Sequence, residues 1–137
     1  MKKVYVGCAM FNAPSEYLLE IAEIKEAIKE GLACEVLEFL PLGTGTPEEV
    51  YTNDIHQMVE ACDIMIAEVS FPSLGLGWEL GTMVEKLRKP VIMCAKKGAK
   101  VSRLVQGAEN EKNPNCRFLW YESHQDLLDQ IKNILTN

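Results

Sequence analysis

The sequence predicts an α/β fold in which helices cover both faces of a parallel β-sheet. Short apolar runs typical of buried strands alternate with helical patterns, and no repeat or linker interrupts them. The length of 137 residues suits one domain with a substantial core, so residues 1–137 are expected to form a single domain. The expected architecture is a three-layer α/β/α sandwich around a five-stranded parallel sheet, of the flavodoxin-like or Rossmann-like kind.

The strands and helices can be placed from apolar patterns and caps. The five expected strands cover residues 4–8, 34–39, 63–69, 91–95 and 117–121. The expected helices cover residues 16–30, 47–61, 77–87, 101–107 and 124–135, joined in part by a Gly/Thr/Pro loop at 41–46. Gly31 is interpreted as a helix stop, whereas Thr46 and Ser123 are expected to be N-caps.

Composition narrows the possible partners and the compartment. Acidic residues outnumber basic ones by 20 to 14, giving a net charge of −6, so polymeric nucleic acid is not expected as a partner. No apolar run approaches the length of a membrane span, and no membrane partner is expected. The five cysteines and two histidines are scattered without metal-ligand spacing, which favours free thiols in the cytoplasm and predicts no metal and no cofactor.

The most informative segment is residues 67–81, which follows a buried strand and leads through Ser, Pro and Gly into a helix. Its Ser73, Gly75 and Gly77 can present backbone N–H groups and a hydroxyl to a phosphate, or form an ordinary helix entry. Glu79 is expected in the first helical turn, as an anionic nucleophile or simply as a residue that favours first turns. The glycine spacing differs from that of a dinucleotide-binding loop.

Other polar residues admit two interpretations each. Asp54 is either a solvated helix residue or the second carboxylate of a site with Glu79. Tyr5 directs its hydroxyl into a pocket or is a core residue with a satisfied hydroxyl. Asp63 is interpreted as a strand-entry residue and Glu68 as structural. The candidate site is expected beyond the carboxyl ends of the first, third and fourth strands.

Several motifs together resemble one enzyme superfamily, that of the nucleoside 2-deoxyribosyltransferases. The string from Pro72 to Gly81 is the most specific, and it is closest to the 2′-deoxynucleoside 5′-phosphate N-hydrolase branch. The similarity extends over nearly the whole chain and includes Val4–Gly7, Asn53–Asp54, Ala61–Asp63, Ala67–Val69, Lys89–Pro90, Val101–Ser102, Gly107–Ala108, Arg117–Phe118 and Trp120.

The resemblance implies roles for individual residues. Glu79 stands where the family places a nucleophile that attacks C1′ of deoxyribose, Asp54 where an acid assists departure of the base, and Tyr5 where a tyrosine orients the nucleophile. Ser73 matches a phosphate contact, and Ser102 matches one donated by the neighbouring subunit of a homodimer.

The remaining implied positions concern the substrate pocket. Gly7, Met10 and Gly75 line the sugar and base in this comparison. Phe11 belongs to the same substrate-binding group, although the hydrolase relatives carry an arginine there; Lys100 or Arg103 is then a candidate for the missing cation.

Three functions are compatible with the sequence. The first is hydrolysis of the N-glycosidic bond of 2′-deoxynucleoside 5′-monophosphates, giving free base and deoxyribose 5-phosphate through a glycosyl-enzyme on Glu79. The second is base exchange on unphosphorylated deoxynucleosides. The third is a non-catalytic nucleotide-binding module.

Overall fold

A five-stranded parallel sheet forms the centre of the structure, a computed structural model that describes residues 1–38 and 43–136. The strand order is β2-β1-β3-β4-β5, and every neighbouring pair is parallel. The strands are β1 (Lys3–Cys8), β2 (Glu35–Val36), β3 (Ile64–Glu68), β4 (Val91–Lys96) and β5 (Cys116–Tyr121).

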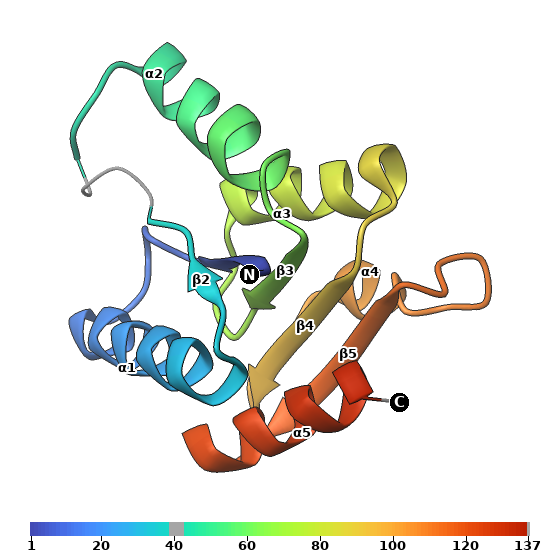
Figure 1. The fold of residues 1–137 in the computed structure, drawn as a ribbon. Coiled ribbons are helices and arrows are strands. Elements are labelled where there is room, and N and C mark those ends of the chain that lie inside the picture. Colours follow the sequence, from blue (N-terminus) through green and yellow to red (C-terminus); the bar gives the residue numbers. More distant parts are fainter. Residues whose placement is uncertain (39–42, 137) are drawn as a thin grey trace.

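Helices cover both faces of this sheet (Figure 1). On one face lie α1 (Ser15–Leu32) and α5 (His124–Thr136), which contact each other. On the other face, α2 (Pro47–Tyr51) continues into the π-helical segment η1 (Thr52–Val59), and α3 (Leu74–Gly81) continues into η2 (Thr82–Leu87). The short helix α4 (Arg103–Gln106) lies between β4 and β5 in sequence. The predicted three-layer α/β/α architecture is confirmed.

Side chains that alternate along the strands divide the core in two. Val4, Val6 and Ile66 face α1 and α5, whereas Tyr5 and Met65 face η1, α3 and η2. Because the chain crosses from β1 to β2 on one side and to β3 on the other, the strand order reverses between β1 and β3. Crevices of open α/β sheets form outside the carboxyl ends of strands at such a reversal.

The helix after β3 begins earlier than its glycines suggested. The predicted start at residue 77 is wrong, because the Ser73 hydroxyl accepts a hydrogen bond from the Leu76 N–H at 3.1 Å and caps α3 from Leu74 onward. Glu79 consequently lies in the second helical turn, and its predicted first-turn position is wrong as well.

Two further boundaries differ from the sequence-based prediction. Helix α1 continues past Gly31 to Leu32 and ends at Ala33, which adopts the left-handed conformation with φ 48°. Gly31 instead permits close packing, since a Cβ there would lie 2.7 Å from Leu128 of α5. Strand β2 has only two residues, and residues 39–42, which include parts of the predicted strand and loop, lie outside the described residues.

Other local predictions are confirmed. Thr46 forms a capping box with Glu49, and the Ser123 hydroxyl accepts from the Asp126 N–H at 3.1 Å at the start of α5. All five cysteines are buried free thiols. Within residues 1–38 and 43–136, no helix combines the length and apolar character that a membrane span requires.

Candidate active site

Glu79 is the central group of the candidate site. Its side chain projects from α3 toward the sheet and is only 6% exposed. Burial is the main cause that raises the pKa of this carboxyl from its ordinary value of 4.5 to about 8. This raised pKa favours the protonated form of Glu79 at neutral pH. The sequence-based expectation that a helix terminus keeps it anionic is wrong, because desolvation outweighs the favourable contacts.

Tyr5 supplies a hydrogen bond to that carboxyl. Its hydroxyl donates to Glu79 Oε2 at 2.8 Å, across 74 residues of sequence. This bond lowers the pKa of Glu79 and so opposes part of the effect of burial. Burial, followed by the charge of Glu79, raises the pKa of Tyr5, so the phenol keeps its proton and acts as a donor.

Asp54 provides a second carboxylate at the same place. It lies half-buried on η1, and both its charge and its hydrogen bonding raise the pKa of Glu79. Asp54 therefore interacts with Glu79, as one of the two interpretations from the sequence expects. Asn53, 8% exposed, donates from Nδ2 to Asp54 Oδ1 at 3.2 Å and orients it. The sequence analysis includes Asn53 in the Asn53–Asp54 motif of the family resemblance but assigns it no role of its own.

Gly7 allows α3 to approach β1 closely enough for this contact. A Cβ at Gly7 would lie 2.8 Å from Leu76 Cδ1 and 2.8 Å from Met65 Cε, so a side chain there would displace both. It would also lie 3.6 Å from the Tyr5 ring. Gly7 is thus beside the cluster, in the layer that sets the distance between strand and helix.

Strand β1, the segment η1 and helix α3 therefore bring Tyr5, Asp54 and Glu79 together on one face of the sheet. The chain matches no family model. It is 33% identical to the 2′-deoxynucleoside 5′-phosphate N-hydrolase 1 of Syntrophotalea carbinolica over 129 residues, which cover 93% of this chain and 78% of that protein. The chain belongs to the 2′-deoxynucleoside 5′-phosphate N-hydrolase family.

Other relatives of this N-hydrolase family match over shorter segments. Those of Thermofilum pendens (34% identity over 66% of this chain) and Nematostella vectensis (33% over 64%) carry the same name. The matches span 61% and 58% of the length of these two proteins. Among solved structures, a Clostridium botulinum CMP N-glycosidase superposes with a TM-score of 0.70 at 19% identity, covering 97% of this chain and 99% of the other. That likeness supports the fold.

The start of α3 is exposed in this member of the N-hydrolase family. Ser73 is half-buried, Gly75 is exposed, and Cβ atoms at Gly75 and Gly77 would meet nothing within 4 Å. The N–H groups of the first helical turn have no hydrogen-bond partners within the helix and point beyond its N-terminal end. They favour an anion at that end of the helix.

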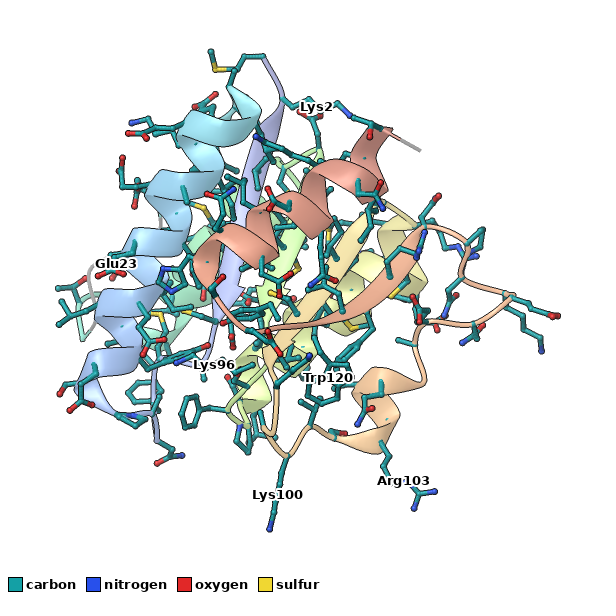
Figure 2. All side chains as sticks on the ribbon, turned by 90° about the horizontal axis from the view of Figure 1, so that it is seen from below. Lys2, Glu23, Lys96, Lys100, Arg103 and Trp120 are labelled. Carbon is teal, nitrogen blue, oxygen red and sulfur yellow. The ribbon has the colours of Figure 1, made fainter. Side chains whose placement is uncertain are left out.

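The segment at the start of α4 contains three further candidates, Lys100, Ser102 and Arg103. Ser102 is exposed and caps α4, where its hydroxyl accepts from the Val105 N–H at 3.4 Å. The side chains of Lys100 and Arg103 extend outward from the molecule (Figure 2). Among the described contacts of one protomer, none joins these three residues to Tyr5, Asp54 or Glu79.

Phe11 and Met10 follow the end of β1 and differ in environment. The Phe11 side chain is 73% exposed, whereas Met10 is half-buried against the core on the α1 side. Phe11 presents an aromatic surface where the hydrolase relatives are expected to present a guanidinium.

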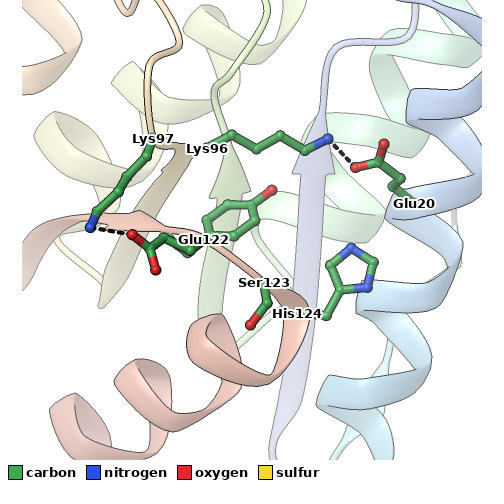
Figure 3. Close-up of a pocket in the computed structure, with 7 residues that line it drawn as sticks. Glu20, Lys96, Lys97, Glu122, Ser123 and His124 are labelled. Atoms are coloured by element: carbon green, nitrogen blue, oxygen red, sulfur yellow. Dashed lines mark hydrogen bonds and ion pairs between the residues drawn. The ribbon is translucent and has the colours of Figure 1, made fainter.

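A cavity of about 470 Å³ lies elsewhere, at the carboxyl ends of β4 and β5 on the α1/α5 side (Figure 3). Glu79 is not among its lining residues. Its two lysines are neutralised, because Lys96 pairs with Glu20 and Lys97 pairs with Glu122 at 2.6 Å. We assign the candidate site to the Glu79 cluster, where two carboxyl groups and a phenol converge, rather than to this cavity.

Among the described residues, no group of three or more His, Cys, Asp or Glu side chains is arranged to hold a metal ion. The most extensive buried polar network instead surrounds Glu68, which is fully buried at the end of β3. The sequence-based interpretation of Glu68 as structural agrees with this burial. The contacts of Glu68 with the loop before Ser73 were not apparent from the sequence.

Proposed function

We propose that the protein hydrolyses the N-glycosidic bond of 2′-deoxynucleoside 5′-monophosphates and releases free base and deoxyribose 5-phosphate. The observation that carries this proposal is the buried contact of Tyr5 and Asp54 with Glu79 in a chain of the N-hydrolase family. Cleavage of such a bond passes through an oxocarbenium-like state at C1′, which a nearby carboxylate can capture and an acid can assist.

The first half-reaction uses the proton held by the carboxyl pair. Because burial favours the protonated form of Glu79, its proton first passes to the hydrogen-bonded Asp54. The Glu79 carboxylate then attacks C1′, the C1′–N bond breaks, and the bonding electrons leave with the base. Asp54 donates its proton to the departing base, and the sugar remains as an ester of Glu79.

The second half-reaction restores the starting state. Asp54, now a carboxylate, removes a proton from a water molecule while the water oxygen attacks C1′. The ester bond breaks, deoxyribose 5-phosphate leaves, and Glu79 recovers its proton from Asp54. Tyr5 donates its hydrogen bond to Glu79 throughout, and this bond favours the carboxylate form that attacks and leaves.

The start of α3 is the proposed site of the 5′-phosphate. The Ser73 loop supports this assignment, because it places a hydroxyl and the N-terminal backbone of α3 on the same helix as Glu79. Gly7, Met10, Phe11 and Gly75 are the proposed surroundings of the sugar and base.

The proposal includes a homodimer in which Ser102 completes the phosphate site of the neighbouring subunit. Its exposure at the start of α4, beside the 85% exposed Leu104, supports availability to a second copy. Arg103 or Lys100 then supplies the cation that Phe11 does not. The free thiols support a reducing compartment, and we propose the cytoplasm.

Incubation with each 2′-deoxynucleoside 5′-monophosphate, with and without a second free base, tests the proposal. We expect chromatography to show base and deoxyribose 5-phosphate without an acceptor base. Mass spectrometry of rapidly quenched, digested samples should show a sugar phosphate on the peptide that contains Glu79. Base exchange confined to unphosphorylated nucleosides would establish a transferase. Binding without turnover would establish a nucleotide-binding module. Equal rates of base release by the wild type and Glu79→Ala would exclude Glu79 as the nucleophile.

A further inference from the structure

The side chain of Glu68 lies on the opposite face of the sheet from Glu79 and accepts four hydrogen bonds. Oε1 accepts from the Tyr17 hydroxyl at 3.0 Å and the Ser70 N–H at 2.7 Å. Oε2 accepts from the Ser70 hydroxyl at 2.8 Å and from the Tyr121 hydroxyl. Each carboxylate oxygen therefore receives one donor from Ser70 and one from a tyrosine, and the side chain is 0% exposed.

These bonds fix the first residue of the loop that leads to α3. Ser70 is held through both its N–H and its hydroxyl, and the same hydroxyl accepts from the Lys96 N–H of β4 at 2.9 Å. Phe71 packs edge-on against the Tyr17 ring, with centroids 4.7 Å apart. The loop from Ser70 to Ser73 is thus attached at its start to one buried carboxylate and ends at the cap of α3.

We propose that Glu68 is a positioning residue: it holds the Ser70–Ser73 loop, and through that loop the phosphate-binding start of α3. This inference rests on the proposed function for its link to phosphate, although the loop tether is independent of it. A carboxylate suits the role because Ser70 offers two donors to two different oxygens. A purely structural buried group would affect stability without a selective effect on phosphate recognition.

Glu68→Gln is a specific test of this geometry. A glutamine has one carbonyl oxygen, so in either orientation its NH₂ group faces one Ser70 donor and one tyrosine hydroxyl. Ser70→Ala removes the hydroxyl bond from the loop side, and Ser70→Thr retains it. Tyr17→Phe and Tyr121→Phe are matched controls, because each removes one donor from the same carboxylate while both Ser70 bonds remain. Tyr17→Phe also retains the ring that contacts Phe71.

The activity measurement compares KM and kcat for dUMP, dCMP, dAMP and dGMP. We expect Glu68→Gln and Ser70→Ala to raise KM for a turned-over monophosphate by about tenfold or more and to lower kcat by less than about threefold. The KM values of Ser70→Thr, Tyr17→Phe and Tyr121→Phe are expected to stay within about twofold of the wild-type value. Each variant is assayed at the same number of degrees below its own Tm. Equal KM changes in the glutamine and tyrosine variants would overturn the proposal.

Amide hydrogen exchange provides a readout that needs no activity. We expect exchange of residues 70–76 to accelerate by about tenfold or more in Glu68→Gln and Ser70→Ala, with little change in the tyrosine variants. Unchanged exchange in Glu68→Gln would overturn the loop tether even if the wild type proves inactive. Conversely, inactivity of the wild type with accelerated exchange in these variants would refute the proposed function and retain the tether.

Discussion

Replacement of Glu79 by glutamine should make the protein more stable at alkaline pH. The pKa of the Glu79 carboxyl is raised to about 8 from its ordinary 4.5, mainly by burial. In the wild type, the folded state therefore binds this proton more tightly than the unfolded chain does. The stability that Glu79 contributes is present in full below about pH 4.5 and is lost as the pH rises to about 8.

The magnitude follows from the difference between the two pKa values. At about 1.4 kcal/mol for each pH unit, ionisation of Glu79 lowers the free energy of unfolding by up to about 5 kcal/mol between pH 4.5 and 8. Glutamine is uncharged over this range, fills a similar volume and can accept the Tyr5 hydrogen bond through its carbonyl oxygen. The stability advantage of Glu79→Gln should therefore grow with pH and level off above about pH 8.

Denaturant unfolding at intervals from pH 4.5 to 9 measures this difference. The control is Glu85→Gln, which removes a glutamate from an exposed position of η2. We expect its stability relative to wild type to change by less than about 0.5 kcal/mol over the series. Parallel stability curves for the wild type and Glu79→Gln would refute the reasoning, because Glu79 would then have a similar pKa in the folded and unfolded states.

Three further substitutions and one control test the surroundings of Glu79. Tyr5→Phe removes the hydrogen bond that lowers the pKa of Glu79, so the decrease in the free energy of unfolding with pH should continue above pH 8. In steady-state assays of this variant, kcat/KM should fall by about tenfold to a hundredfold. Asp54→Asn removes a charge that raises the pKa of Glu79, so the decrease in the free energy of unfolding should end below pH 8. Base release by this variant should slow by about a hundredfold or more, because no acid protonates the departing base. Gly7→Ala should lower the free energy of unfolding by about 1 kcal/mol, because its Cβ would force the ends of the Leu76 and Met65 side chains to move. Gly77→Ala, on an open helix face, is the control and should raise the free energy of unfolding by up to about 1 kcal/mol in the same denaturant titrations.

The sequence was sufficient to place most elements because their signals are local. Five apolar runs separated by helical patterns predict a parallel sheet, and the Thr46 and Ser123 caps mark helix starts through hydrogen bonds within three residues. The start of α3 was misplaced for a local reason as well. Gly75 and Gly77 have low helix propensity, but Ser73 caps the helix before them.

The site depended on contacts that no local pattern encodes. The sequence alone identified Tyr5, Asp54 and Glu79 as candidates, while their roles came from the family resemblance. Only the tertiary structure brings a strand, a π-helical segment and a helix close enough for one buried hydrogen-bonded cluster. The charge state of Glu79 was misjudged from its place on a helix, since desolvation by residues distant in sequence sets its pKa. Periodicity and caps act over a few residues, whereas burial depends on the whole fold.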